Sequence, residues 1–155
     1  MDPSIKYREA TTQDIEQIMA VRHSVIENTL TDPTSISPVD VQEYITTRGK
    51  GWVAEQKTTI VGFSILDTRE NSIWALFVRP GHEGLGIGRR LQEIMLRAHF
   101  AGSKVSLTLT TTKGTRAERF YMRSGWQVIG HLDEDELRFE LSYEGWLRHF
   151  TARDC

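Results

Sequence analysis

The sequence predicts a mixed α/β domain whose central sheet is mostly antiparallel and is flanked by helices. Segments with strand-like alternation and segments with helix-like apolar spacing follow one another along the chain. Three strand-like segments in the middle, residues 52–55, 59–67 and 72–78, are separated only by short turns. Two more, 126–130 and 137–141, enclose an acidic turn and form a closing hairpin. This order is not a regular strand-helix repeat, so it differs from a doubly wound sheet.

The expected order of elements is β-α-α-β-β-β-α-β-α-β-β. The remaining elements are a strand at 5–9, a helix from 15 to 26, a loop at 28–37, a helix after Ser37 that Gly49 ends, a helix after Gly88 that Gly102 ends, a strand at 105–110 and a helix at 117–124. Thr11 and Asp14 stand close to capping-box spacing before the first helix, and Ser37 caps the second. Apolar residues at helical spacing give the three longer helices a buried face: Ile15, Ile18, Met19, Val25 and Ile26; then Val41, Tyr44 and Ile45; then Leu91, Ile94, Met95 and Ala98.

The composition is that of one compact domain over residues 1–155, because 155 residues with 39% hydrophobic content can bury a substantial core. No apolar run approaches the roughly 20 residues of a membrane helix. The first residues lack the apolar segment of a signal peptide, so we expect a cytoplasmic protein with no membrane partner. The single cysteine, Cys155, excludes disulfides within one chain, and no histidines have metal-ligand spacing, so we expect no metal.

The net charge of −2 gives no general reason to bind nucleic acid. The charge is unevenly distributed along the chain. Residues 79–123 hold nine Lys and Arg against three Glu, whereas residues 1–78 and 124–155 each carry a net charge of −4. A basic middle suits an anionic ligand, and the acidic N-terminal part suits a cationic one. The alternative is that these charges lie on solvated faces without a ligand.

The sharpest local feature is a glycine-rich loop between a strand and a helix, with Gly81, Gly84, Gly86 and Gly88 in close succession. Glycines at such a junction let backbone N–H groups approach a phosphate, and the start of the helix adds a positive end. The spacing excludes a dinucleotide fingerprint, and a P-loop fails because arginines follow the last glycine. A tight turn without a ligand is the alternative to a pyrophosphate site of another type.

Two motifs in this region resemble those of the GNAT superfamily of acyl-CoA-dependent N-acyltransferases. The first is a strand ending in apolar-x-Val, followed by (Gln/Arg)-x-x-Gly-x-(Gly/Ala) at the start of a helix. It matches Leu76-Phe77-Val78 and then Glu83-Gly84-Leu85-Gly86-Ile87-Gly88. The second, Ala-x-x-(Phe/Leu)-Tyr-x-x-x-Gly-(Phe/Trp), matches residues 117–126. With the order of elements, the resemblance covers residues 5–141 and implies the GNAT fold with acetyl-CoA as cofactor.

The resemblance implies a set of cofactor-binding residues. The main chain of Leu76, Phe77 and Val78 should pair with the pantetheine arm, as an added strand does. The strands at 72–78 and 104–110 are splayed apart in many members to admit that arm. The backbone amides of the loop should hold the pyrophosphate: Gly84, Leu85, Gly86, Ile87, Gly88 and Arg89. On the other side of the arm we expect Ala117, Phe120 and Tyr121.

Two residues depart from the family pattern. Glu83 stands where Gln or Arg is usual, which places a carboxylate near phosphate. If only its backbone is used, the side chain can turn to solvent and binding is kept. Gly114 stands where many members carry Asn, so that contact is missing or is replaced by Thr112 or Thr115.

The resemblance places Tyr121 at the usual position of the acid that protonates the departing sulfur. The alternative is a tyrosine that only packs against pantetheine. A base must also deprotonate an acceptor amine, because an alkyl amine with a pKa near 10.4 is mostly charged at pH 7. Neither strand that carries a carboxylate in some members has one here, so the candidates are Glu27, Asp67, Glu70 or a chain of waters.

Three further side chains have open roles. His23 and His131 lie where surface or capping roles compete with catalysis, and Trp74 either shapes the acceptor pocket or fills the core. The C-terminal tail, residues 143–155, carries Trp146, Leu147 and Phe150 at one-turn helical spacing. This tail packs on its own domain or meets a second subunit in a homodimer.

We therefore expect an N-acetyltransferase that moves an acetyl group from acetyl-CoA to a primary amine of a small molecule or peptide by direct attack on the thioester. Tyr121 and Glu27 are the expected catalytic pair. One alternative is a catalytically silent acyl-CoA-binding sensor or regulatory domain, which the missing strand carboxylates favour. Another is a nucleotide-binding module that uses the loop for ADP alone. Fold alone does not separate these functions.

Overall fold

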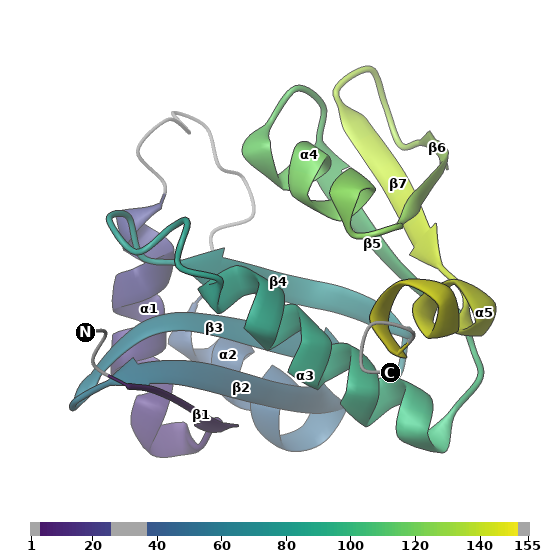
Figure 1. The fold of residues 1–155 in the computed structure, drawn as a ribbon. Coiled ribbons are helices and arrows are strands. Elements are labelled where there is room, and N and C mark those ends of the chain that lie inside the picture. The colour runs from purple at the N-terminus through teal and green to yellow at the C-terminus, as the bar shows by residue number, and fades with distance from the viewer. Residues whose placement is uncertain (1–3, 26–36, 152–155) are drawn as a thin grey trace. The chain divides into compact units, whose positions relative to one another are not determined.

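A computed structural model of the chain describes residues 4–25 and 37–151. It contains two compact units. The N-terminal unit comprises Met1–Glu70 and Trp74–Met95, and the C-terminal unit comprises Asn71–Ile73 and Leu96–Cys155. Seven strands form an open, mostly antiparallel sheet in the order β1-β2-β3-β4-β5-β7-β6 (Figure 1). This confirms the predicted fold class, while the single domain boundary over residues 1–155 stays a prediction.

The N-terminal unit contains the first four strands and the helices that cover them. Its elements are β1 (Ile5–Glu9), a 3-10 turn (Thr12–Asp14), α1 (Ile15–Ser24), α2 (Pro38–Glu43), a π-helical turn (Tyr44–Arg48), β2 (Gly49–Gln56), β3 (Thr59–Asp67), most of β4 (Ser72–Val78) and the first part of α3 (Ile87–Gly102). Strands β1, β2 and β3 pair antiparallel, with Ile5 opposite Gln56 and Gly49 opposite Asp67.

Helices cover both faces of the sheet in the N-terminal unit (Figure 1). On one face, α1, α2 and the π-helical turn bury an apolar cluster against the strands; its members include Ile18, Val21, Val41, Ile45, Val53, Phe63 and Ile65. On the other face, α3 approaches β3 closely at Gly62. A Cβ on Gly62 would lie 3.1 Å from Ile87 Cγ2 and 3.2 Å from Leu91 Cδ1, so a side chain here would need its neighbours to move by a few tenths of an ångström.

Both predicted helix caps form. The carboxylate of Asp14 accepts the backbone N–H of Thr11 at 2.8 Å and both terminal nitrogens of Arg8 at 2.8 and 2.9 Å. These hydrogen bonds, led by those from Arg8, lower the pKa of Asp14 below its usual value. At α2, Ser37 and Asp40 form a reciprocal capping box, in which Ser37 N–H donates to the Asp40 carboxylate and Asp40 N–H donates to Ser37 Oγ.

Three predicted element boundaries are wrong. Strand β2 begins at Gly49 and not at residue 52. Helix α1 ends at Ser24, so Val25 follows the helix, Val21 joins the buried stripe, and Ile26 lies outside the described residues. Strand β5 spans Leu107–Thr112 and not 105–110. The main chain of Val105 is already used locally, because its N–H donates to Ser103 Oγ and its carbonyl oxygen lies 2.7 Å from His99 Nε2. Its side chain is 54% exposed and has no strand partner to pack against.

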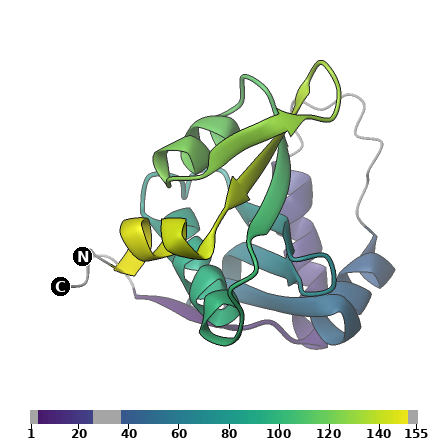
Figure 2. The same cartoon turned by 90° about the vertical axis from the view of Figure 1, so that its right-hand side faces the viewer.

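The C-terminal unit contains a three-stranded antiparallel sheet (Figure 2). Its elements are β5 (Leu107–Thr112), α4 (Arg116–Arg123), β6 (Gln127–His131), β7 (Glu136–Leu141), α5 (Tyr143–Trp146) and a second π-helical turn (Leu147–Thr151). Strand β5 also meets the start of β4 in parallel, with Ser72 opposite Thr108. The described part of the tail, residues 143–151, is helical as predicted, and Trp146 stacks on Phe100 with ring centroids 5.2 Å apart.

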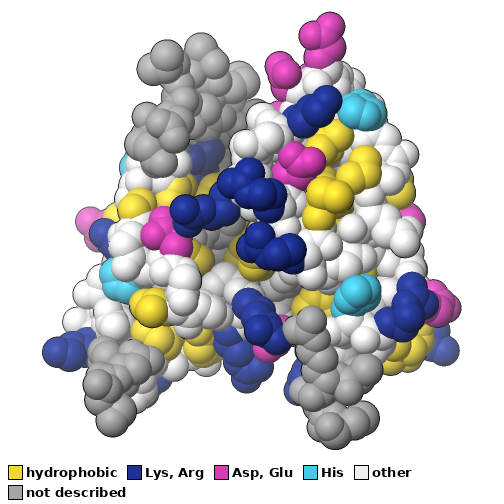
Figure 3. Space-filling model, turned by 45° about the horizontal axis from the view of Figure 1, so that its top comes forward, with side chains coloured by type: hydrophobic (Ala, Val, Ile, Leu, Met, Phe, Trp, Pro, Cys, Tyr) yellow, Lys and Arg dark blue, Asp and Glu magenta, His cyan; other side chains and the backbone are white. Residues whose placement is uncertain are grey.

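Strand β6 is the last strand in the sheet order, and its pairing with β7 contains a bulge between Val128 and Gly130. Val128 and Ile129 are 43% and 48% exposed. The turn that joins β6 to β7 is acidic: residues 133–135 are all Asp or Glu, all exposed, and form the magenta group at the end of this hairpin in Figure 3.

Among residues 4–25 and 37–151, no helix combines the length and the apolar character needed to cross a membrane.

Candidate active site

The C-terminal end of β4 supplies the first part of the candidate cofactor site. Leu76, Phe77 and Val78 are half-buried. Just beyond them, Arg79 N–H donates to the carbonyl oxygen of Val61 on β3 at 2.8 Å. The register pair between β4 and β5 is at Ser72, the opposite end of β4 from these three residues. The predicted pairing of this main chain with a pantetheine arm stays a prediction.

The glycine loop leads directly from β4 into α3. His82 N–H donates to Arg79 O in a turn, and Arg90 N–H donates to Gly86 O at the start of the helix. Gly84 and Gly86 have φ values of +81° and +83°, which residues with a side chain rarely adopt, and no atom lies within 4 Å of where a Cβ would stand. The loop therefore exposes its backbone next to the positive end of a 16-residue helix, an arrangement that favours an anionic group.

Glu83 is exposed, and its carboxylate accepts the backbone N–H of Gly81 at 2.9 Å, so the side chain folds back onto its own loop. The negative charge therefore stays beside the backbone that is expected to hold phosphate.

The cations of this region differ in how they are used. Arg89 Nε and Arg90 Nη1 lie 3.5 and 3.3 Å from the carboxylate of Glu93 on the same helix. Two other nitrogens near the loop, Arg79 Nε and His82 Nδ1, are buried without a hydrogen-bond partner among the described residues. Buried donors without a partner are costly, and an anionic ligand would give Arg79 an acceptor. The residues of the loop thus fit a phosphate-bearing cofactor.

The second family motif begins α4 in the C-terminal unit. Thr115 caps the helix, with Glu118 N–H donating to its Oγ1 at 3.2 Å, and its hydroxyl donates to Thr112 O. Gly114 has a φ of +81°, and its N–H donates to the Glu118 carboxylate at 2.6 Å. The hydroxyl of Thr112 donates to Glu136. The hydroxyls of Thr112 and Thr115, the two proposed replacements for the missing Asn contact, are thus already engaged within this unit.

Tyr121 lies in the aromatic core of the C-terminal unit. Its side chain is 6% exposed, and its ring centroid lies 5.0 Å from Phe120, 5.6 Å from Trp126 and 6.4 Å from Phe139. Burial raises the pKa of its phenol well above the usual value, so the hydroxyl is protonated but is a weaker acid than that of an exposed tyrosine. The ring contacts show that packing is part of its role. Ala117 and Phe120 are half-buried on the same helix.

The structure separates the candidates for the base. Glu27 lies outside the described residues. Asp67 is buried and fully engaged: its carboxylate accepts Arg48 Nη2 at 3.0 Å and the backbone N–H groups of Arg69 and Glu70. Glu70 is exposed in the turn before β4.

The two histidines that had open roles, His23 and His131, are exposed on α1 and β6. Within the described residues, no three His, Cys, Asp or Glu side chains form a group that could hold a metal ion.

Trp74 on β4 has partners that the sequence analysis did not identify. Its ring stacks on Tyr44 with centroids 3.8 Å apart and planes 8° from parallel, and the guanidinium of Arg48 lies 5.0 Å from the Tyr44 centroid. Two residues of the predicted core stripe, Tyr44 and Ile45, therefore have different roles, because Ile45 is buried and Tyr44 is only half-buried. The signal in the sequence that could have indicated this was the presence of a tyrosine, Tyr44, in an otherwise apolar stripe.

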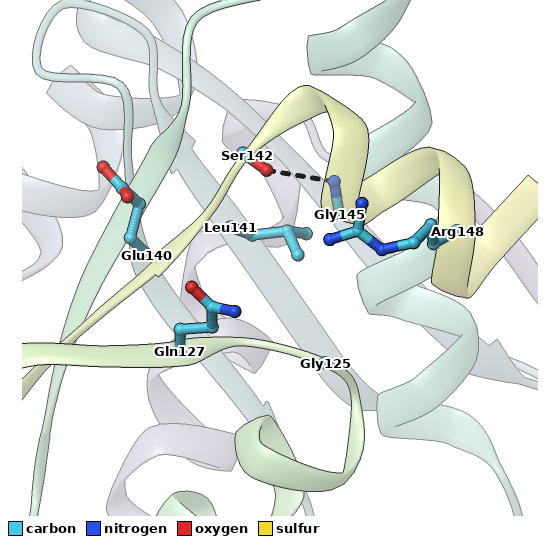
Figure 4. Close-up of a pocket in the computed structure, with 7 residues that line it drawn as sticks. All are labelled: Gly125, Gln127, Glu140, Leu141, Ser142, Gly145 and Arg148. Carbon is cyan, nitrogen blue, oxygen red and sulfur yellow. Dashed lines mark hydrogen bonds between the residues drawn. The ribbon is translucent and has the colours of Figure 1, made fainter.

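A small pocket of the C-terminal unit lies elsewhere (Figure 4). It is lined by Gly125, Gln127, Glu140, Leu141, Ser142, Gly145 and Arg148. Its volume is about 40 Å³. None of the predicted cofactor or catalytic residues lines it, and Ser142 Oγ is used to cap α5 by accepting Gly145 N–H.

The chain belongs to the GNAT acetyltransferase family. Residues 13–137 match the family model described as an acetyltransferase (GNAT) domain, which covers most of the chain and both motifs. No curated protein matches the sequence.

Solved structures with the same fold share little sequence with the chain. The PaiA N-acetyltransferase of Thermoplasma acidophilum, solved in complex with coenzyme A, is 17% identical with a TM-score of 0.80, over 90% of this chain and 99% of that one. A GNAT acetyltransferase of Staphylococcus aureus Mu50 is 20% identical with a TM-score of 0.76, over the same shares of the two chains. The ribosomal-protein-S18-alanine N-acetyltransferase of Escherichia coli is 15% identical with a TM-score of 0.72, over 90% and 94%. These similarities confirm the predicted fold.

Proposed function

We propose that this protein transfers an acetyl group from acetyl-CoA to a primary amine of a small molecule or a peptide. The observation that carries the proposal is the exposed glycine loop between β4 and α3, with Gly84 and Gly86 at positive φ, in a chain of the GNAT family. The complex of the Thermoplasma PaiA enzyme with coenzyme A supports the choice of cofactor. The cytoplasmic location expected from the sequence belongs to the same proposal.

The cofactor would be held at three places. The backbone amides of residues 84–89 bind the pyrophosphate, and Arg79 donates to a phosphate oxygen. The main chain of Leu76, Phe77 and Val78 pairs with the pantetheine arm. In the C-terminal unit, Ala117, Phe120 and Tyr121 contact the arm. When bound, the cofactor supplies an acetyl group activated as a thioester.

The acetyl transfer needs a group that accepts a proton from the amine and a group that donates a proton to the sulfur. The acceptor must lose a proton before its nitrogen attacks, and Glu27 or a chain of waters accepts that proton. Asp67 is not suited to this task, because its carboxylate is buried and engaged by Arg48 and two backbone N–H groups. The phenol of Tyr121 donates a proton to the departing sulfur. A C–N bond forms as the C–S bond breaks, and the nitrogen loses a second proton as the amide forms. This second proton balances the one gained by the thiolate, and the proton taken from the ammonium before attack is released to solvent.

Calorimetric titration with acetyl-CoA, CoA and ADP tests the proposal, with Gly86→Glu as the control. A side chain at Gly86 is strained at its φ of +83° and places a carboxylate in the loop. We expect saturable binding of acetyl-CoA, weaker binding of ADP, and loss of both in the variant. Equal affinity for ADP and CoA would favour a nucleotide-binding module. Tight binding without turnover on any amine would favour the silent sensor.

A further inference from the structure

A stacked aromatic pair lies at the start of β4. Trp74 and Tyr44 are in face-to-face contact, with ring centroids 3.8 Å apart and planes within 8° of parallel. Both side chains pack against the apolar cluster of the N-terminal unit, yet both stay only partly buried. In contrast, the apolar neighbours of Trp74 on the strand, Ile73 and Ala75, are buried, with only 9% and 4% of their surface exposed. The pair is therefore at the surface of the core and not within it.

The Tyr44 ring is held in place from its own helical turn. The guanidinium of Arg48, four residues further on, lies 5.0 Å from the ring centroid and donates to Asp67 at 3.0 Å. Asp67 in turn is fixed by two backbone N–H groups of the turn before β4. Cation–π contact and a half-buried ion pair thus orient Tyr44, and Tyr44 orients Trp74.

The position of Trp74 along β4 gives this pair a functional meaning that rests on the proposed function. If the phosphates bind at the loop after Val78, the pantetheine arm runs back along Leu76–Val78 toward the start of β4. Trp74 precedes Leu76 by two residues, which is about 7 Å along a strand. Its side chain is therefore at the level of the acyl end of the arm, where an acceptor must approach.

Several carboxylates of the N-terminal unit are engaged within that unit. Asp14 and Glu55 pair with Arg8, Asp67 pairs with Arg48, and Asp40 caps α2. On the aromatic side of β4 the charged groups in ring contact are guanidinium groups, with Arg22 4.9 Å from the Phe77 centroid and Arg48 over Tyr44.

We propose that the Trp74–Tyr44 pair forms a wall of the acceptor site and selects a primary amine that carries an apolar group, best an aromatic ring, close to its nitrogen. An aromatic surface gains contact area and ring stacking from such a group. The second ammonium of a diamine provides neither. Trp74 and Tyr44 determine specificity, while Tyr121 and the base perform the proton transfers.

The test compares 2-phenylethylamine, n-propylamine and 1,4-diaminobutane in a free-thiol assay, together with calorimetric binding of 2-phenylethylamine to the CoA-bound protein. Wild type should prefer 2-phenylethylamine over the diamine by at least roughly tenfold in kcat/KM. Trp74→Ala should lower kcat/KM for 2-phenylethylamine by about tenfold, through KM, and weaken its binding to a similar degree, with little change for n-propylamine. Trp74→Phe and Tyr44→Phe keep a stacked ring and should retain the preference.

Each outcome decides between the proposals. Preference for the diamine in wild type, or an unchanged selectivity in Trp74→Ala whose acetyl-CoA affinity is intact, would overturn the inference and leave the proposed function in place. Absence of turnover on every amine would overturn both. If Trp74→Ala loses acetyl-CoA binding, the test of the inference passes to Tyr44→Ala, because Tyr44 lies outside β4. Unchanged binding of 2-phenylethylamine to Tyr44→Ala would then overturn the inference.

Discussion

The carboxylate of Glu83 accepts the backbone N–H of Gly81 at 2.9 Å, within the loop that is expected to bind pyrophosphate. The carboxylate is a fixed negative charge that a phosphate would meet. At a separation of about 6 Å in water, two unit charges repel by somewhat less than 1 kcal/mol.

Glu83→Gln should therefore bind CoA roughly threefold more tightly than wild type, because it removes the charge and can keep the hydrogen bond to Gly81. Glu83→Ala also loses that bond and should gain less. Calorimetry with CoA measures both, and Glu16→Gln, an exposed residue on α1, is the matched control with an unchanged Kd. Weaker binding in Glu83→Gln would mean that the carboxylate organises the loop and does not oppose the phosphate.

Tyr121→Phe separates the two roles of this residue. The ring contacts with Phe120, Trp126 and Phe139 survive the change, while the proton is lost. We expect turnover to fall at least tenfold, as general acids commonly contribute about 10²-fold or more. The CoA affinity should stay within about twofold of wild type, since no phosphate contact is involved. Steady-state kinetics and calorimetry check this, and unchanged turnover would leave Tyr121 with packing alone.

Asp14 should make stability depend on pH in the acid range. Its pKa is lowered in the folded state, chiefly by the hydrogen bonds from Arg8, so its contribution is present above the usual carboxyl pKa. That contribution is lost as the pH falls through the lowered pKa. Asp14→Asn should lower the free energy of unfolding at pH 7 by about 1–3 kcal/mol. Urea unfolding from pH 7 to pH 2.5 should show the difference from wild type shrinking, whereas Glu16→Gln should show no such trend.

Gly125, the glycine of the second family motif, is required for two physical reasons. Its φ is +95°, and a Cβ there would lie 2.5 Å from the His149 ring. Gly125→Ala should destabilise the protein by about 2–4 kcal/mol, from backbone strain together with overpacking. Adding His149→Ala should recover the overpacking part only. Gly102→Ala is the control, since nothing lies within 4 Å of its Cβ position and its φ is not positive; thermal unfolding of the three variants would contradict this account if Gly102→Ala were as damaging.

The sequence predicted the features that depend on local pattern. The helix caps at Thr11 and Ser37, the glycine loop and the order of elements along the chain follow from spacing and from the conformations that each residue allows. Features that depend on distant residues facing each other were not predicted. Arg48 and Asp67 are 19 residues apart in the sequence, and β2 and β3 lie between Tyr44 and Trp74 in the sequence although their rings are in contact. Periodicity places each of these side chains on a face but does not say which partner stands opposite.

The same distinction holds for the candidate site. The loop and the strand before it are contiguous motifs, so their residues could be named from the sequence. The base could not be named from the sequence, because a carboxylate can accept a proton only if it is not already paired with a cation. Asp67 is paired with Arg48, and this pairing depends on the fold.

The end of the sheet at β6 bears on how the protein behaves at high concentration. An edge strand with two exposed aliphatic side chains, Val128 and Ile129, offers a template on which another chain can add. The bulge at Ile129 breaks the regular spacing of main-chain groups along that template, and the acidic turn beyond it repels a second copy of itself (Figure 3). We therefore expect the bulge in β6 to disfavour edge-to-edge aggregation. Deleting Ile129 should remove the bulge and leave a regular edge strand that can pair with another chain.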